Sequence, residues 1–185
     1  MTSAIFGRSL PMTEEEFLAL GESPERVELL DGSLLVTPAP TPRHQHISRK
    51  LANALDASSS ALYVVEAVNV RLQPGRIPIP DIVLAEVIDF DNPIVDAEAV
   101  QLVCEIVSPS NASADKVLKM HYYAAAGIPW YLLVEQETCS LHLYRLSGTH
   151  YVEHSVTHAG QLLRLKEPLV AMIAPEDLLP PDHRD

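Results

Sequence analysis

Two short apolar runs, each containing one carboxylate, constrain this sequence more than any other feature. Residues 79–85 contain Asp81, and residues 102–107 contain Glu105. Strands that are apolar along their whole length are usually buried on both faces. An ionised carboxylate buried there is costly unless it is paired or bound to a metal. We therefore expect both acids to lie on neighbouring strands and to share one site.

The chemistry of two carboxylates indicates which ion such a site would hold. Carboxylate oxygens suit Mg²⁺, or the related Mn²⁺, and Mg²⁺ rarely takes more than one or two of them. Such an ion polarises a phosphoryl oxygen and lowers the pKa of an attacking water. The alternative is that an acid lies at a strand end and faces water. It stays open for Asp81, because Pro80 can mark the first residue of a strand, and it is weaker for Glu105, which has apolar neighbours on both sides.

The remaining patterns predict a mixed sheet flanked by helices. A capping box at Thr13 and Glu16 starts a short helix, and Asp31-Gly32 joins an N-terminal hairpin. We further expect helices at residues 43–56 and 114–126, strands at 63–72 and 130–135, an acidic loop at 89–98 and a hairpin at 141–156. The fold class is α/β (α+β), in one domain spanning residues 1–185, with a loose tail from about residue 176.

Composition limits the partners and the compartment. The 185 residues suit one domain, and their net charge of −12 opposes nucleic acid, so a nucleic-acid site would need a local basic patch or a bound metal. Cys104 and Cys139 have no CxxC spacing, no signal peptide is apparent, and no apolar run could span a bilayer. A cytoplasmic protein without membrane contact is expected. The oligomeric state, a homodimer included, stays open.

Several motifs together resemble one protein family. They are Thr13-Glu14-Glu15-Glu16-Phe17, Glu28-Leu29-Leu30-Asp31-Gly32, Arg43-His44-Gln45, Pro80-Asp81, Glu105-Ile106-Val107-Ser108-Pro109-Ser110, and the triplet Asp115, Lys119 and Tyr123. In this order they resemble the Uma2 family of the PD-(D/E)XK nuclease superfamily, over about residues 12–134. The resemblance implies a restriction-endonuclease-like core, a Mg²⁺-type site at Asp81 and Glu105, and nuclease chemistry.

The sequence departs from the superfamily pattern at one position. Val107 stands where a lysine is expected two residues after Glu105. The resemblance implies that Lys119 replaces it, and the spacing permits this, because Asp115, Lys119 and Tyr123 share one helical stripe. An ammonium there could stabilise charge developing on a phosphate. The alternative is a solvated Lys119 paired with Asp115.

Other polar residues are weaker candidates for the site. Glu28 matches the family's first acidic position and could add a carboxylate or accept a proton, or it could simply face solvent in the hairpin. Glu66 could be a further ligand, although a strand-edge position is favoured. Arg43 and His44, at the start of a helix, could contact a phosphate, although a polar first turn is favoured.

Three functions remain open from the sequence. The first is a metal-dependent endonuclease cutting DNA, with Asp81, Glu105, Lys119 and Glu28 as catalytic candidates. The second is a nuclease-fold protein that binds without cleaving, which the acidic charge and Val107 favour. The third is a metal-dependent hydrolase of a small phosphoester, which would need no basic surface.

Overall fold

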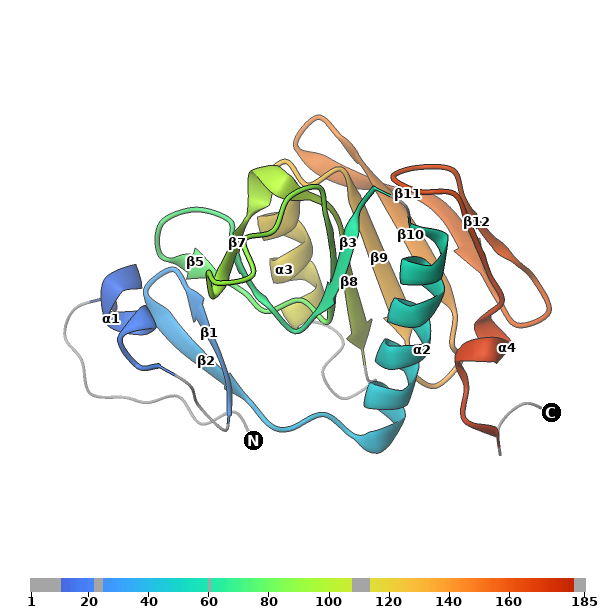
Figure 1. Ribbon diagram of the computed structural model, residues 1–185, viewed down its shortest axis with the longest axis horizontal. Helices are drawn as coiled ribbons and strands as arrows, with labels where there is room; N and C mark the ends of the chain where they lie inside the picture. The colour runs from blue at the N-terminus through green and yellow to red at the C-terminus, as the bar shows by residue number, and fades with distance from the viewer. Residues whose placement is uncertain (1–10, 22–24, 60, 108–113, 182–185) are drawn as a thin grey trace.

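The computed structural model describes residues 11–21, 25–59, 61–107 and 114–181. The side chains of residues 114–116, Asp115 among them, lie outside the described part. Within these ranges, four helices and one 3₁₀ turn accompany the strands, arranged as in Figure 1. They are α1 (Glu14–Leu18), α2 (Pro42–Ser58), η1 (Ala97–Ala99), α3 (Ala114–Ala125) and α4 (Pro175–Leu178). The strands are β1 (Arg26–Leu30), β2 (Ser33–Thr37), β3 (Tyr63–Glu66), β4 (Asn69–Arg71), β5 (Arg76–Ile77), β6 (Ile82–Ala85), β7 (Ile94–Asp96), β8 (Val100–Val107), β9 (Trp130–Glu135), β10 (Leu141–Ser147), β11 (His150–Thr157), β12 (Leu163–Leu165) and β13 (Ala171–Ile173).

A six-stranded mixed sheet forms the centre of the molecule, which confirms the expected fold class. Its order is β11-β10-β9-β8-β6-β3, with β8 and β9 parallel and the other pairs antiparallel. Side chains alternate between two cores. Leu102, Cys104 and Leu132 pack with α2 on one face, and Val103, Tyr131 and Tyr123 of α3 pack on the other. Figure 1 shows the two helices on either side of this sheet.

A smaller sheet at the other end of the molecule carries the N-terminal hairpin (Figure 1). Its order is β2-β1-β5, and Asp31 and Gly32 join β1 to β2 with φ of 52° and 78°, as a type I′ turn requires. The capping box of Thr13 is present on α1. The helix buries Phe17 against Leu29 and Ile77. The sequence predicted both the turn and the cap.

Three expectations of secondary structure and order fail. The strand expected over 63–72 breaks into β3 and β4, because Ala67 adopts φ of 52° and its N–H bonds the Asp81 carbonyl. The acidic loop expected at 89–98 contains β7 and η1, and β7 pairs in parallel with β4. Residues 176–181 are not a loose tail, since Leu178 and Leu179 are buried in the core beside α2.

Helix α2 is held by a buried stripe and a capped start. Thr41 accepts from the N–H of His44 at 3.2 Å, and Pro42 follows at the first helical position. Ile47, Leu51 and Leu55 are fully buried, as their spacing predicts.

No helix within the described ranges is long and apolar enough to cross a membrane.

Truncating this stripe should destabilise the whole domain. Leu51→Ala leaves a cavity between α2 and the sheet, so we expect a loss of about 2–5 kcal/mol in the free energy of unfolding. Urea denaturation measures it. Arg49→Ala, on the exposed side of the same helix, is the control and should change stability by less than about 0.5 kcal/mol. Equal losses in the two variants would contradict the assignment of the core face.

Candidate active site

The register of the central sheet brings Asp81 and Glu105 together. Ile82 pairs with Cys104 in the antiparallel ladder, and the N–H of Asp81 donates to the Cys104 carbonyl at 3.1 Å. Continued by one residue, this register sets Asp81 opposite Glu105 on one face of the sheet. Both side chains are buried, with 4% and 7% of their surfaces exposed. The backbone N–H of Ile106 donates to Asp81 Oδ2 at 2.7 Å and fixes the carboxylate.

Helix α3 covers this face and adds a cation and a phenol. Lys119 Nζ lies 3.3 Å from Glu105 Oε1, and Tyr123 donates its hydroxyl hydrogen to the same oxygen at 2.6 Å. Both residues come from the stripe that the sequence predicted. Lys119 is 9% exposed, so the solvated alternative does not describe it.

The N-terminal hairpin supplies the other half of the cluster. Glu28, on β1, is fully buried, and its Oε1 accepts from Lys119 Nζ at 2.8 Å and from the N–H of Ile79 at 2.7 Å. Arg26, two residues earlier on the same strand face, donates to Asp81 Oδ1 at 2.7 Å and to the Ile79 carbonyl. Arg26 and Glu28 therefore hold the segment that leads into Asp81.

The charged groups of the cluster shift one another's pKa values. Burial alone would raise the pKa of Asp81, but the hydrogen bond from His44 and the charge of Arg26 hold it at about 2. Burial raises the pKa of Glu105, Lys119 opposes this rise, and Asp81 adds to it. Burial would lower the pKa of Lys119, yet Glu105 and Glu28 outweigh burial and raise it. At neutral pH Asp81 is thus ionised and Lys119 protonated.

The donor chemistry of this cluster fits a hard divalent cation. Three carboxylates face two basic groups, Arg26 and Lys119. The buried Glu28 Oε2 has no hydrogen-bond partner among the residues that the structure describes. An unpaired buried carboxylate oxygen is costly, and a cation would relieve it. No group of three His, Cys, Asp or Glu within the described part is arranged to hold a metal as it stands. The reason is that Arg26 and Lys119 already engage the carboxylates.

Comparison with known proteins bears on the family and the fold. The sequence model of the Uma2 family, described as "Putative restriction endonuclease", matches residues 14–175. The chain belongs to the Uma2 family. A solved structure of "a putative nuclease belonging to DUF820 from Anabaena variabilis ATCC 29413" superposes with a TM-score of 0.72, at 16% identity, over 91% of this chain and 97% of the other. A search of curated proteins finds no match.

Within this Uma2 fold, one of the weaker candidates contacts the carboxylate cluster and two do not. His44 joins the site, because its Nε2 lies 3.1 Å from Asp81 Oδ2 and must donate to that ionised carboxylate. Arg43 is half-buried, and none of the hydrogen bonds described for this part of the chain joins it to the carboxylates. Glu66 lies on the edge strand β3 and accepts from Ser48 at 2.7 Å, which agrees with the strand-edge position.

Arg26 is the member of the cluster that the sequence analysis missed. A signal was available, because Arg26 and Glu28 are two residues apart on one strand and so project from the same face. Any site that includes Glu28 therefore has Arg26 as a neighbour. What the sequence alone did not supply was that the whole hairpin docks against Asp81.

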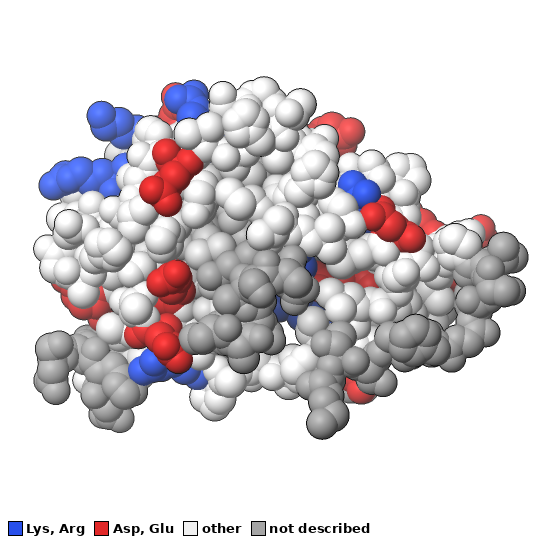
Figure 2. Space-filling model, turned by 180° about the vertical axis from the view of Figure 1, so that it is seen from behind, with Lys and Arg blue, Asp and Glu red and all other residues white. Residues whose placement is uncertain are grey.

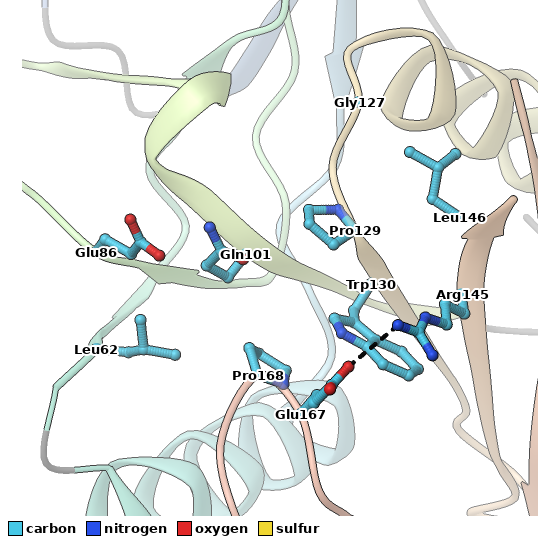
Figure 3. A pocket seen from close by; sticks show the side chains of 10 residues that line it. All are labelled: Leu62, Glu86, Gln101, Gly127, Pro129, Trp130, Arg145, Leu146, Glu167 and Pro168. Carbon is cyan, nitrogen blue, oxygen red and sulfur yellow. Dashed lines mark ion pairs between the residues drawn. The ribbon is translucent and has the colours of Figure 1, made fainter. Parts of the chain in front are cut away.

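A separate pocket lies at the opposite end of β8. Its volume is about 410 Å³, and its lining includes Gln101, Trp130 and Arg145 (Figure 3). Arg145 pairs with Glu167 at 3.3 Å across the Trp130 ring. Gln101 precedes Glu105 by four residues, or about 13 Å along the strand. This pocket therefore does not contain the carboxylate cluster.

Proposed function

We propose that this chain is a metal-dependent nuclease that hydrolyses phosphodiester bonds of DNA. The observation that carries the proposal is the buried cluster in which Asp81 and Glu105 face each other and Lys119 contacts Glu105 at 3.3 Å. So many buried charges are not explained well by a stabilising role alone, because the desolvation penalty of a buried ion pair can exceed its Coulombic gain. Membership of the Uma2 family and the nuclease-like fold support the same reaction class.

Each residue has a distinct role in this proposal. Asp81 and Glu105 would hold a Mg²⁺ or Mn²⁺ ion, which when bound polarises a phosphoryl oxygen and lowers the pKa of the attacking water. Lys119 keeps a positive charge next to Glu105, where it would stabilise negative charge on the reacting phosphate. Tyr123 orients the Glu105 carboxylate through its 2.6 Å hydrogen bond. Glu28 fixes the Lys119 ammonium.

The net charge of −12 bears on how DNA would approach. Basic side chains are not spread evenly. In Figure 2 the most evident group of Lys and Arg side chains lies at the upper left, and acidic side chains lie beside it and elsewhere on that face. Arg145, Arg164 and Lys166 line one pocket on the C-terminal strands. Such a local group can contact phosphates even when the whole protein is acidic, and its contribution weakens as salt rises.

A cleavage assay tests the proposal. Supercoiled plasmid incubated with the protein at low salt should be nicked or linearised when Mn²⁺ or Mg²⁺ is added, and should stay intact with EDTA. Asp81→Asn protein serves as the control for contaminating nucleases. Absence of divalent-dependent cleavage over a range of DNA substrates would contradict the proposal.

The same assay can include a second candidate substrate. The acidic surface favours a phosphodiester smaller than duplex DNA, because a small substrate needs no extended basic groove. Bis(p-nitrophenyl) phosphate reports this activity through released nitrophenolate. Divalent-dependent hydrolysis of this ester, together with inert plasmid and oligonucleotides, would favour the small-phosphoester hydrolase over the nuclease.

A further inference from the structure

Arg26 is the cation that pairs with Asp81, one of the two proposed metal ligands. Its Nη1 lies 2.7 Å from Asp81 Oδ1, and its other terminal nitrogen donates to the Ile79 carbonyl. The guanidinium thus pairs with Asp81 and also binds the backbone of the segment that leads into it.

We propose that Arg26 is the resident counter-cation of Asp81 in the metal-free protein, and that a divalent cation must displace it. The inference rests on the proposed function, since it concerns the same metal centre. It assigns Arg26 as a positioning residue whose contact with Asp81 keeps the centre closed until metal binds.

The contacts of Asp81 explain why the two cations compete. Oδ2 already accepts from the Ile106 N–H at 2.7 Å and from His44 at 3.1 Å. Arg26 donates to the other oxygen, Oδ1. A divalent cation held by Asp81 would add a second positive charge beside the guanidinium in a buried site. Their repulsion is strong there, because little water screens them.

Arg26, rather than Lys119, is the cation that can leave. The Lys119 ammonium bridges two carboxylates, Glu28 and Glu105, and its side chain is 11% exposed. Arg26 pairs with one carboxylate, its side chain is 21% exposed, and its buried Nε has no hydrogen-bond partner among the described residues. Displacing Arg26 therefore breaks one ion pair, whereas displacing Lys119 breaks two, and Arg26 is the more exposed of the two side chains. Once released from Asp81, the guanidinium could bind a phosphate of the substrate through two parallel hydrogen bonds, because the two groups match in geometry.

Removing the competitor should tighten metal binding. Arg26→Met keeps much of the apolar stem and removes the charge, so we expect Mn²⁺ to bind about 10- to 100-fold more tightly than to wild type, as measured by calorimetry. Mn²⁺ should also raise the melting temperature more in this variant, because the metal then compensates Asp81 alone. Arg76→Met is the matched control. Arg76 pairs with Asp31 outside the cluster at 2.6 Å and is 15% exposed, and its loss should leave Mn²⁺ affinity unchanged.

The outcomes separate the inference from the proposed function. Suppose that wild type binds Mn²⁺ and that Asp81→Asn abolishes this binding. If Arg26→Met then leaves Mn²⁺ affinity unchanged or weakens it, the role of Arg26 is overturned while the metal centre stands. No Mn²⁺ binding to wild type or to the Arg26 variants would overturn both. If Arg26→Met does not fold, Arg26→Gln, which keeps an amide donor for the Ile79 carbonyl, replaces it. Tighter Mn²⁺ binding in either variant supports competition between Arg26 and the metal. The same holds for a variant that folds only when Mn²⁺ is added.

Discussion

Asp81→Asn is expected to abolish divalent-dependent cleavage and the binding of Mn²⁺ to the protein. The amide keeps the size of the side chain but removes the negative charge that a metal needs. The rate should fall by at least the roughly hundred- to thousand-fold that loss of one electrostatic group causes. Single-turnover cleavage measures the rate, and calorimetry measures Mn²⁺ affinity. Glu105→Gln should give the same result, because both carboxylates face one site.

Asp31→Asn is the matched control for Asp81→Asn. Asp31 is also paired with an arginine, accepting from Arg76 at 2.6 Å, but it lies at the hairpin turn and is half exposed. Asparagine tolerates its φ of 52°, so cleavage should be unchanged. Circular dichroism must accompany the comparison, since Asp81→Asn leaves Arg26 without its partner and should lower stability. A folded Asp81→Asn protein that binds Mn²⁺ with wild-type affinity would refute the metal centre.

Lys119→Met should lower the cleavage rate by roughly a hundred- to thousand-fold while leaving the metal bound. The ammonium that touches Glu105 is lost, whereas Asp81 and Glu105 keep their charges. The variant should also lose about 3–5 kcal/mol of stability, because Glu28 and Glu105 then remain buried without their shared cation. Methionine preserves the packing of the lysine stem but not the two ion pairs.

A double variant separates the chemical effect from the loss of stability. Glu28→Gln combined with Lys119→Met removes one of the stranded carboxylates, so stability should recover in part while the rate stays low. Lys50→Met, on a partly exposed lysine of α2, is the control and should cleave like wild type. Wild-type rates in folded Lys119→Met protein would remove Lys119 from the chemistry.

The sequence predicted the parts of the site that depend on local pattern. Asp81 and Glu105 were visible because each interrupts an apolar run, and antiparallel pairing then brings them together. Lys119 and Tyr123 were visible because helical spacing puts them on one stripe. Such periodicities survive in any fold that buries the strands and the helix.

The parts that failed depend on tertiary contacts. Arg26 enters the site only because the hairpin docks against the segment before Asp81. The strand expected over 63–72 is broken by Ala67, a residue that rarely adopts positive φ and is held there by its bond to the Asp81 carbonyl. Neither contact leaves a periodic trace in the sequence.

The site is assembled from two segments of the chain, because β1 lies outside the main sheet. Residues 38–41 form an irregular connector between β2 and α2. Arg26 and Glu28 precede this connector, whereas Asp81, Glu105 and Lys119 follow it. A chain cut there would yield two fragments, neither of which holds the complete set of charges. Activity recovered on mixing the fragments would then report their reassembly, so this protein is a natural subject for fragment complementation.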